Sequence, residues 1–409
     1  MRSFRRVLVL FVLVGCHDLT GLGARHILWF HADLKGAAAE PYADSTLAVF
    51  TAFNDMRVIA LDPQNGRLRW QARLPLALGV PYAGMPFGGT ISAYKDLIIV
   101  PAWDVYALDR ASGAVRWSFT QADDYPGYNT AVVAGGTVYS VGRDLYALDA
   151  ATGALKYRLT IGEQPFRPVV VDSVIYIATR REVLPGTLGN GHVMALLART
   201  GATIWSVPID DPQDSVRGGS VGPVFVTDSM AIVAGQNGIV YALDRFTGQT
   251  RWTYTGAGSY EAGVAIVDHT VIVAGDVGSV EGVDLATGHR LWQTGPGSSV
   301  TERITLGDEV ALVSVGALFA FDANGQIRWQ VGGAGWGGPV YSTAATYRNG
   351  LIYIGSVSPE DPGPGFTRCA CPDPSARKTA EIPQSHPTAA SNRVSHSGHA
   401  AGRPAARSR

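Results

Sequence analysis

The chain repeats one short pattern of apolar and polar positions seven times. Each unit opens with alternating apolar residues, as in VYALD, passes through a turn that ends in Gly, and closes on an aromatic residue. The alternation predicts a strand with one buried face. Asp followed by Gly predicts a tight turn, because the carboxylate accepts backbone N–H groups and glycine adopts positive φ. The closing residues are Trp70, Trp117, Tyr157, Trp205, Trp252, Trp292 and Trp329.

The spacing of these units indicates the architecture. The closing aromatics recur every 37 to 48 residues, and two further strands around a hairpin precede each unit, as in TAVVAGGTVYSVG. Four antiparallel strands in a period of about 40–50 residues predict propeller blades, with each tryptophan packed between neighbouring sheets. Turns at both ends of every strand disfavour a solenoid. The turn positions are Asp62, Asp109, Asp149, Leu197, Asp244, Asp284 and Asp322.

The signature ALDxxTGxxxW resembles the PQQ-like repeat of eight-bladed, quinoprotein-type β-propellers. The resemblance covers residues 29–358 and implies an all-β, eight-bladed fold. A strand at 26–29 precedes Trp70 by one repeat length, and we predict that it closes the ring as the outer strand of the last blade. The first two strands of that blade are predicted at 341–347 and 351–356. Nothing after Ser356 resembles LYALD, so we expect this blade to be incomplete.

Composition supports a folded β-rich body and excludes some functions. Only 16% of the residues are charged, 49 of 409 are Gly, and the formal net charge is −1. A balanced charge argues against nucleic-acid binding, which needs a clustered basic face. Residues 359–409 are rich in Pro, Ala, Ser and Arg without periodicity, and we expect a disordered tail there, whether genuine or frame-shifted.

The N-terminus has the pattern of an exported lipoprotein. Basic residues precede the apolar run VLVLFVLV, which is too short for a membrane span, and Leu13-Val14-Gly15-Cys16 follows. This ending resembles the bacterial lipobox and implies cleavage before Cys16 and its lipidation. We therefore expect a signal peptide at 1–16, a linker at 17–25 and a propeller at 26–358. His17 in place of Asp favours the outer over the inner membrane.

Candidate chemistry is sparse. In quinoprotein dehydrogenases a cofactor stacks on Trp beside a vicinal cysteine pair, whereas this chain has no cysteine between His17 and Arg368. Cys369 and Cys371 match no usual zinc spacing. Gly218–Gly222 fits G-x-S-x-G but leads into a predicted strand instead of a helix. We therefore expect no catalytic residue, no metal site and no cofactor.

The least repetitive loops, which lead into the first strand of each blade, carry our candidate contact residues for a protein partner. Aromatic residues and Arg favour binding hot spots, and we select Arg167, Arg217, Tyr260, Glu261 and Arg303.

Lipobox, propeller and missing cysteines together resemble the lipoprotein propellers of the outer-membrane β-barrel assembly machinery. The resemblance implies a periplasm-facing, non-enzymatic scaffold, monomeric within a complex with barrel assembly proteins. The alternatives are a periplasmic ligand-binding or sensor propeller and, behind it, a PQQ-dependent oxidoreductase.

Overall fold

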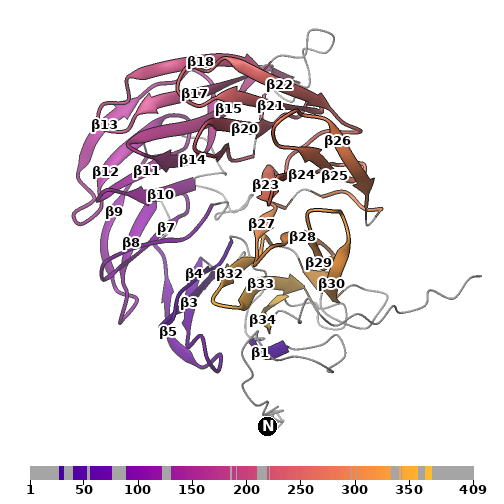
Figure 1. Cartoon of the computed structure of the whole chain (residues 1–409). Helices are drawn as coiled ribbons and strands as arrows, with labels where there is room; N and C mark the ends of the chain where they lie inside the picture. Colours follow the sequence, from indigo (N-terminus) through magenta and orange to yellow (C-terminus); the bar gives the residue numbers. More distant parts are fainter. Residues whose placement is uncertain are drawn as a thin grey trace, which may run out of the picture.

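The chain forms a ring of radially arranged sheets. In the computed structural model, strands build eight antiparallel sheets side by side around a centre, each running outward from an inner strand (Figure 1). This arrangement is a β-propeller, as the sequence predicts. No helix in the part of the chain that the structure describes is long and apolar enough to cross a membrane. The described residues are 27–31, 40–52, 56–75, 89–121, 130–184, 187–189, 191–209, 219–220, 222–295, 297–300, 302–332, 340–341, 343–357 and 364–370.

We number the sheets as blades in chain order. Blade 1 contains β2 (Tyr42–Ala43), β3 (Ala48–Thr51), β4 (Arg57–Leu61) and β5 (Leu68–Arg73). Blade 2 contains β6 (Ser92–Tyr94), β7 (Leu97–Pro101), β8 (Val105–Asp109) and β9 (Val115–Phe119). Blade 3 contains β10 (Thr130–Ala134), β11 (Thr137–Val141), β12 (Leu145–Asp149) and β13 (Leu155–Leu159). Blade 4 contains β14 (Gln164–Val171), β15 (Val174–Leu184), β16 (Thr187–Gly189), β17 (Gly191–Leu197) and β18 (Thr203–Ile209). Blade 5 contains β19 (Phe225–Val226), β20 (Met230–Ala234), β21 (Ile239–Asp244) and β22 (Thr250–Thr255). Blade 6 contains β23 (Val264–Val267), β24 (Thr270–Ala274), β25 (Val280–Asp284) and β26 (Arg290–Thr294). Blade 7 contains β27 (Thr305–Leu306), β28 (Ala311–Val315), β29 (Ala317–Phe321) and β30 (Ile327–Gly332).

The last sheet, blade 8, joins the two ends of the propeller. It contains β31 (Val340–Tyr341), β32 (Thr346–Arg348), β33 (Leu351–Val357), β34 (Pro364–Ala370) and the N-terminal β1 (Ile27–His31). The predicted closure by the N-terminal strand is confirmed, since β1 is the outer strand. The expectation of an incomplete blade is wrong: β34 pairs with both β33 and β1. Residues 364–370 therefore belong to the propeller and not to the expected tail. Backbone hydrogen bonds make the pairing of β34 with its two neighbours, so this strand does not need the repeat motif.

In seven of the eight blades, the aromatic residue of the outer strand is hydrogen-bonded to the turn of the next blade. The Trp117 indole N–H of blade 2 donates to the Ala150 carbonyl of blade 3 at 3.3 Å, and the indole ring covers Gly153 of the same turn. Gly153 has φ +73°, and a Cβ there would lie 2.7 Å from the ring. Tyr157 replaces the indole with a hydroxyl that donates to the Ala198 carbonyl at 2.8 Å. The other indole bonds are Trp29 to Pro63, Trp70 to Arg110, Trp205 to Arg245, Trp252 to Leu285 and Trp292 to Ala323.

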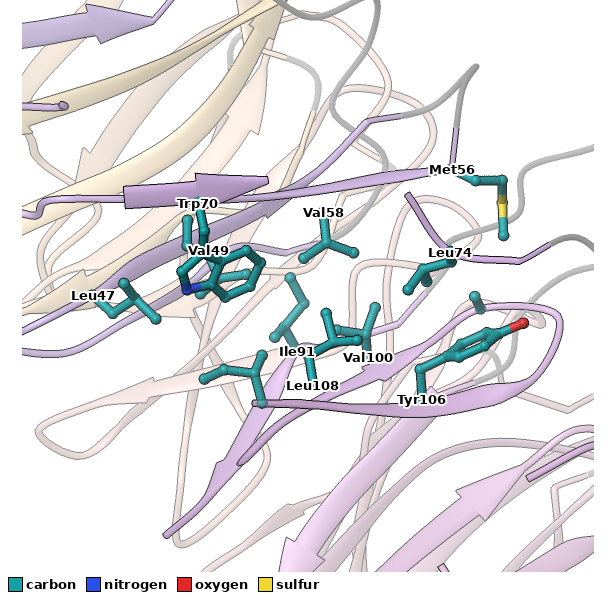
Figure 2. Packing of buried hydrophobic residues seen from close by; sticks show 13 residues of the cluster. Leu47, Val49, Met56, Val58, Trp70, Leu74, Ile91, Val100, Tyr106 and Leu108 are labelled. Carbon is teal, nitrogen blue, oxygen red and sulfur yellow. The ribbon is translucent and has the colours of Figure 1, made fainter. Parts of the chain in front are cut away.

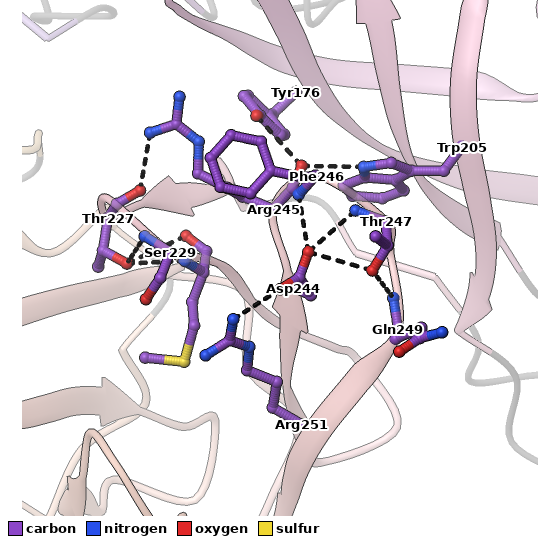
Figure 3. A network of polar contacts seen from close by, with 11 residues as sticks. Tyr176, Trp205, Thr227, Ser229, Asp244, Arg245, Phe246, Thr247, Gln249 and Arg251 are labelled. Carbon is purple, nitrogen blue, oxygen red and sulfur yellow. Dashed lines mark hydrogen bonds and ion pairs between the residues drawn. The ribbon is translucent and has the colours of Figure 1, made fainter.

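The turn aspartates hold the conformation that these aromatics cover. The Asp244 carboxylate accepts the backbone N–H groups of Phe246 and Thr247, both at 3.0 Å, and pairs with Arg251 at 2.6 Å (Figure 3). The Arg251 hydrogen bond and these N–H donors lower the pKa of Asp244 to about 2. The sequence-based interpretation of the Asp–Gly turn is thus confirmed.

Apolar side chains fill the wedges between blades. Between blades 1 and 2, for example, Val58 and Trp70 face Val100 and Leu108 (Figure 2). Trp70 is only 7% exposed, so the closing tryptophan of this repeat belongs to the core. Trp329 packs in the same way against the cluster that includes Ile352 and Ile354 of blade 8.

Substitutions at two glycines with positive φ, Gly153 and Gly135, distinguish the cost of backbone strain from the cost of a collision with the aromatic ring. Ala at either position costs about 1–2 kcal/mol for the left-handed conformation. We expect Gly153→Ala to lose about 1–3 kcal/mol more, because its Cβ also collides with Trp117, while Gly135 (φ +54°) has no atom within 4 Å of such a Cβ. Urea unfolding of both variants measures the difference, and equal losses would contradict the packing role of the ring.

The pairing of β34 predicts that truncation weakens the closed ring. A chain ending at residue 358 leaves β33 and β1 without their shared neighbour. We expect its Tm to fall by about 5 °C or more, since 1 kcal/mol corresponds to about 2–4 °C in domains of 150–250 residues. A chain ending at Cys371 is the control and should melt with the full-length chain. Identical melting of both truncations would show that β34 contributes nothing.

Candidate functional site

In the parts of the chain that the structure describes, the blades are joined at one face of the propeller, for example by residues 256–263 and 302–304, and we call this face the loop end. The Asp–Gly turns join the third and fourth strands of each blade at the opposite face, the turn end. Of the five candidate contact residues, the structure brings Arg167 and Arg303 together at the loop end, joined by Glu40. Tyr260 and Glu261 lie in a separate cluster between blades 5 and 6. Arg217 and the lipidation candidate Cys16 lie outside the described residues.

Glu40 connects three blades across the channel. It precedes β2 of blade 1, and its Oε2 accepts a hydrogen bond from Arg303 Nη1 of blade 7 at 2.7 Å. Arg167 Nη1, from β14 of blade 4, lies 3.6 Å from the same oxygen. The Glu40 side chain is 9% exposed, against 23% for Arg167 and 33% for Arg303. A nearly buried carboxylate thus holds two cations from opposite sides of the ring.

The electrostatics of this cluster follow from burial and like charge. Burial, and then the charge of Arg303, lower the pKa of the Arg167 guanidinium, which nevertheless stays protonated. Burial raises the pKa of Glu302, and the Arg167 charge opposes that rise. The charges of Glu40 and Glu302 balance those of the two arginines. The charges of this cluster are therefore largely compensated within it.

Beyond this cluster the channel holds a cavity of about 380 Å³. Its wall is mostly aliphatic and comes from the inner strands of blades 4 to 8, with Val169, Val224, Val264 and Ala345 among its residues. Glu40 and Arg303 also contact it. Such a space suits an apolar group with one charged end.

The second cluster surrounds a buried carboxylate that the sequence reading missed. Glu281 stands where three of the other six repeats have Tyr (VEGVD against VYALD) and is fully buried. It accepts hydrogen bonds from Tyr254 and, at 2.9 Å, from Ser279 Oγ. Burial and the Glu281 bond raise the pKa of Tyr254 to about 12, and burial beside Glu281 also raises that of Tyr260. The cluster is a structural polar network between blades 5 and 6.

This network corrects one candidate. Tyr260 is fully buried, so its side chain offers no surface to a partner, and the expectation of a contact residue there is wrong. The loop folds inward because the tyrosine ring fills the space beside Glu281. Its neighbour Glu261 is half-buried and accepts a hydrogen bond from Gln236 Nε2 at 2.9 Å.

Sequence reasoning also missed Glu40. It lies 263 residues from Arg303, and no motif surrounds it. The available signal was its place just before the first inner strand, where the chain enters the channel in the other blades. A single acidic residue at that position could not be distinguished from an ordinary loop charge.

The repeat region of this chain matches a known protein family. A family model described as outer membrane protein assembly factor BamB matches residues 102–186 and 189–335, more than half of the chain. The fold and repeat define a PQQ-like repeat propeller. The chain belongs to the family that this model describes, the outer membrane protein assembly factor BamB family.

Individual relatives are more distant. BamB of Yersinia pestis is 29% identical over 209 residues, which are 50% of this chain and only 40% of that protein. The crystal structure of BamB from Moraxella catarrhalis superposes with a TM-score of 0.55 at 20% identity, over 71% of this chain and 84% of that one. Quinohemoprotein alcohol dehydrogenase from Comamonas testosteroni gives a TM-score of 0.65 at 15% identity, over 88% and 78%. These two structures establish a likeness of fold alone.

The channel residues do not fit the quinone and calcium that the dehydrogenase fold implies. None of the described residues around the cavity is Trp, on which the quinone would stack. The single carboxylate there, Glu40, is bonded to Arg303. In the described ranges, no three His, Cys, Asp or Glu residues gather as a metal site.

The Glu40 cluster predicts a specific loss of stability. We expect Glu40→Gln to lower the free energy of unfolding by about 1.5–3 kcal/mol, the contribution of hydrogen bonds to charged groups. The two arginines would then lose the carboxylate that lies between them. Asp96→Asn, at an exposed pair with Arg116, is the control and should cost below about 1 kcal/mol. Chemical denaturation measures both, and a loss for Glu40→Gln no greater than the control would contradict the bridging role.

Proposed function

We propose that the protein is a non-enzymatic scaffold of the BamB type, which assists the assembly of β-barrel proteins in the outer membrane through protein contacts. The observation that carries this proposal is the family match across blades 2 to 7. The Glu40 cluster is compatible with it, because the carboxylate of Glu40 is paired with Arg167 and Arg303. The partners would be the barrel assembly proteins, and the protein would act as a monomer within their complex.

The proposed location is the periplasmic face of the outer membrane, through a lipid on Cys16. In this arrangement the loop end carries the contact surface, with Arg217, Glu261 and the exposed parts of Arg167 and Arg303. Arg303 is one-third exposed while it holds Glu40, so it can contribute one face to a partner without releasing its bond.

A second candidate function has one observation in its favour. The aliphatic channel cavity of about 380 Å³ is large enough for a small ligand, which a periplasmic sensor would bind. A sensor would require no stable association with the barrel assembly proteins.

Co-purification distinguishes the scaffold from these alternatives. We expect the tagged full chain, recovered from solubilised envelopes after mild crosslinking, to retain barrel assembly proteins, and Arg217→Glu to reduce their recovery at least about tenfold, because a reversed interface charge costs several kcal/mol. Arg69→Glu, on an exposed outer strand, is the control and should retain them.

Two outcomes would contradict the scaffold. Absence of those proteins from the wild-type sample would favour the sensor. Dye reduction by the purified chain with PQQ and Ca²⁺ would favour an oxidoreductase.

A further inference from the structure

Blade 4 departs from the repeat at two positions that act as a pair elsewhere. In five other blades the turn Asp pairs with an Arg or Lys of the outer strand, at N–O distances of 2.5–3.5 Å. Blade 4 has Leu197 and Ile204 at these positions. The turn itself is unchanged, since the Gly201 N–H still donates to the Leu197 carbonyl at 2.7 Å. An ion pair has been exchanged for two apolar side chains on an intact turn.

Both side chains are exposed, and the turn of blade 5 that Trp205 covers carries a third exposed apolar residue, Phe246. Leu197 is 45% exposed, Ile204 43% and Phe246 62%. Ile204 precedes Trp205, and Phe246 follows Arg245, whose carbonyl accepts the Trp205 indole N–H at 2.9 Å (Figure 3). We call these three residues the apolar patch. The equivalents of Phe246 in the other turns are Gln64, Ala111, Ala151, Arg199, Ala286 and Asn324.

The charges around the patch leave one cation available. Arg245 pairs with Asp172, and Arg251 with Asp244. Arg199, in the same turn as Leu197, is exposed and makes no hydrogen bond or ion pair with any residue that the structure describes. A carboxylate on a partner would therefore find an unpaired guanidinium beside the patch.

A groove extends from Arg199 between blades 3 and 4. It has a volume of about 480 Å³, and Tyr139, Tyr157 and Val170 line it together with Arg199. Tyr157 is the one tyrosine among the aromatics that cover a turn. Its smaller ring fills less of this junction than an indole would, and the groove can accept a side chain.

We propose that the apolar patch, Arg199 and this groove form a docking surface for a peptide segment of another protein, one that presents adjoining apolar side chains beside a carboxylate. Folding does not require the departures, because five sister turns have the same backbone with the ion pair. Exposed apolar side chains that replace an ion pair, on a turn that also carries an exposed guanidinium, favour a contact surface. The surface lies at the turn end, opposite the loop end, and the proposal does not depend on the proposed function.

Restoring the repeat tests the surface without disturbing the fold. The variant Leu197→Asp/Ile204→Arg recreates the pair of the sister blades, and its Tm should equal or exceed that of the wild type. A phage library of random 12-residue peptides is selected on the full chain, with counter-selection on this variant. We expect the enriched peptides to share two or more apolar residues and an acidic one. Their synthetic forms should bind the variant at least tenfold more weakly by fluorescence anisotropy, and Arg199→Ala several-fold more weakly.

Blade 6 supplies the matched control. Leu291 is 53% exposed at the position of Ile204, beside an Asp284 that is still present. Leu291→Arg therefore builds the same ion pair away from the patch and should leave peptide binding unchanged. Phe246→Ala, a residue that sister turns carry, should reproduce the loss if the double variant does not fold.

Four outcomes would overturn the proposal. The first is that no enriched peptide distinguishes the wild type from the variants, and the second is that the enriched peptides lack a carboxylate. The third is a dimer of the wild type that the variants lose in light scattering, which would make a second copy the occupant. The fourth is flotation of the wild type but not of the variants with phosphatidylethanolamine–phosphatidylglycerol vesicles, which would make it a lipid surface.

Discussion

The bond from an outer-strand aromatic to the turn of the next blade is the constraint on which the rest of the molecule depends. A sheet of four short strands is marginal by itself, and each blade gains its stability from its neighbours. The indole supplies apolar area and one directed N–H, and the turn supplies a flat glycine surface and one carbonyl. The same contact joins the two ends of the ring, where the Trp29 indole N–H of β1 donates to the Pro63 carbonyl in the turn of blade 1.

This constraint explains which parts of the fold could be predicted. Trp29 lies one period before Trp70, so the sequence alone indicated that the N-terminus closes the ring. Nothing comparable indicated β34, because the structure uses its backbone to satisfy β33 and β1. The sequence of β34 contains Pro, Gly and Cys and does not show the pattern of a strand. Its position in the sheet depends on pairing with β33 and β1.

The site was less predictable than the fold, for a related reason. Repeats reveal what neighbouring blades share, whereas the channel cluster consists of residues that meet once. Glu40 and Arg303 are 263 residues apart, and each is an ordinary charge in its own loop. The prediction for Tyr260 was wrong for a different reason. It lies in a loop that sequence reasoning assigned to the surface, but the replacement of a repeat tyrosine by Glu281 draws it inward.

Departures from the repeat therefore carry the information that the repeat itself lacks. Some are compensated inside the fold, as Glu281 is by Tyr254 and Ser279. Others have no internal compensation: Leu197 gives up the N–H groups and the cation that Asp244 holds in the next blade, and gains no burial. A substitution that removes local bonds and leaves the side chain in water is not explained by folding energy, and this is the reason for which we propose a contact with a second molecule there. By this criterion the two ends of the propeller differ. At the loop end, Glu40 is paired within the ring with Arg167 and Arg303, whereas the turn of blade 4 presents two apolar side chains and a guanidinium to the docking surface that we propose.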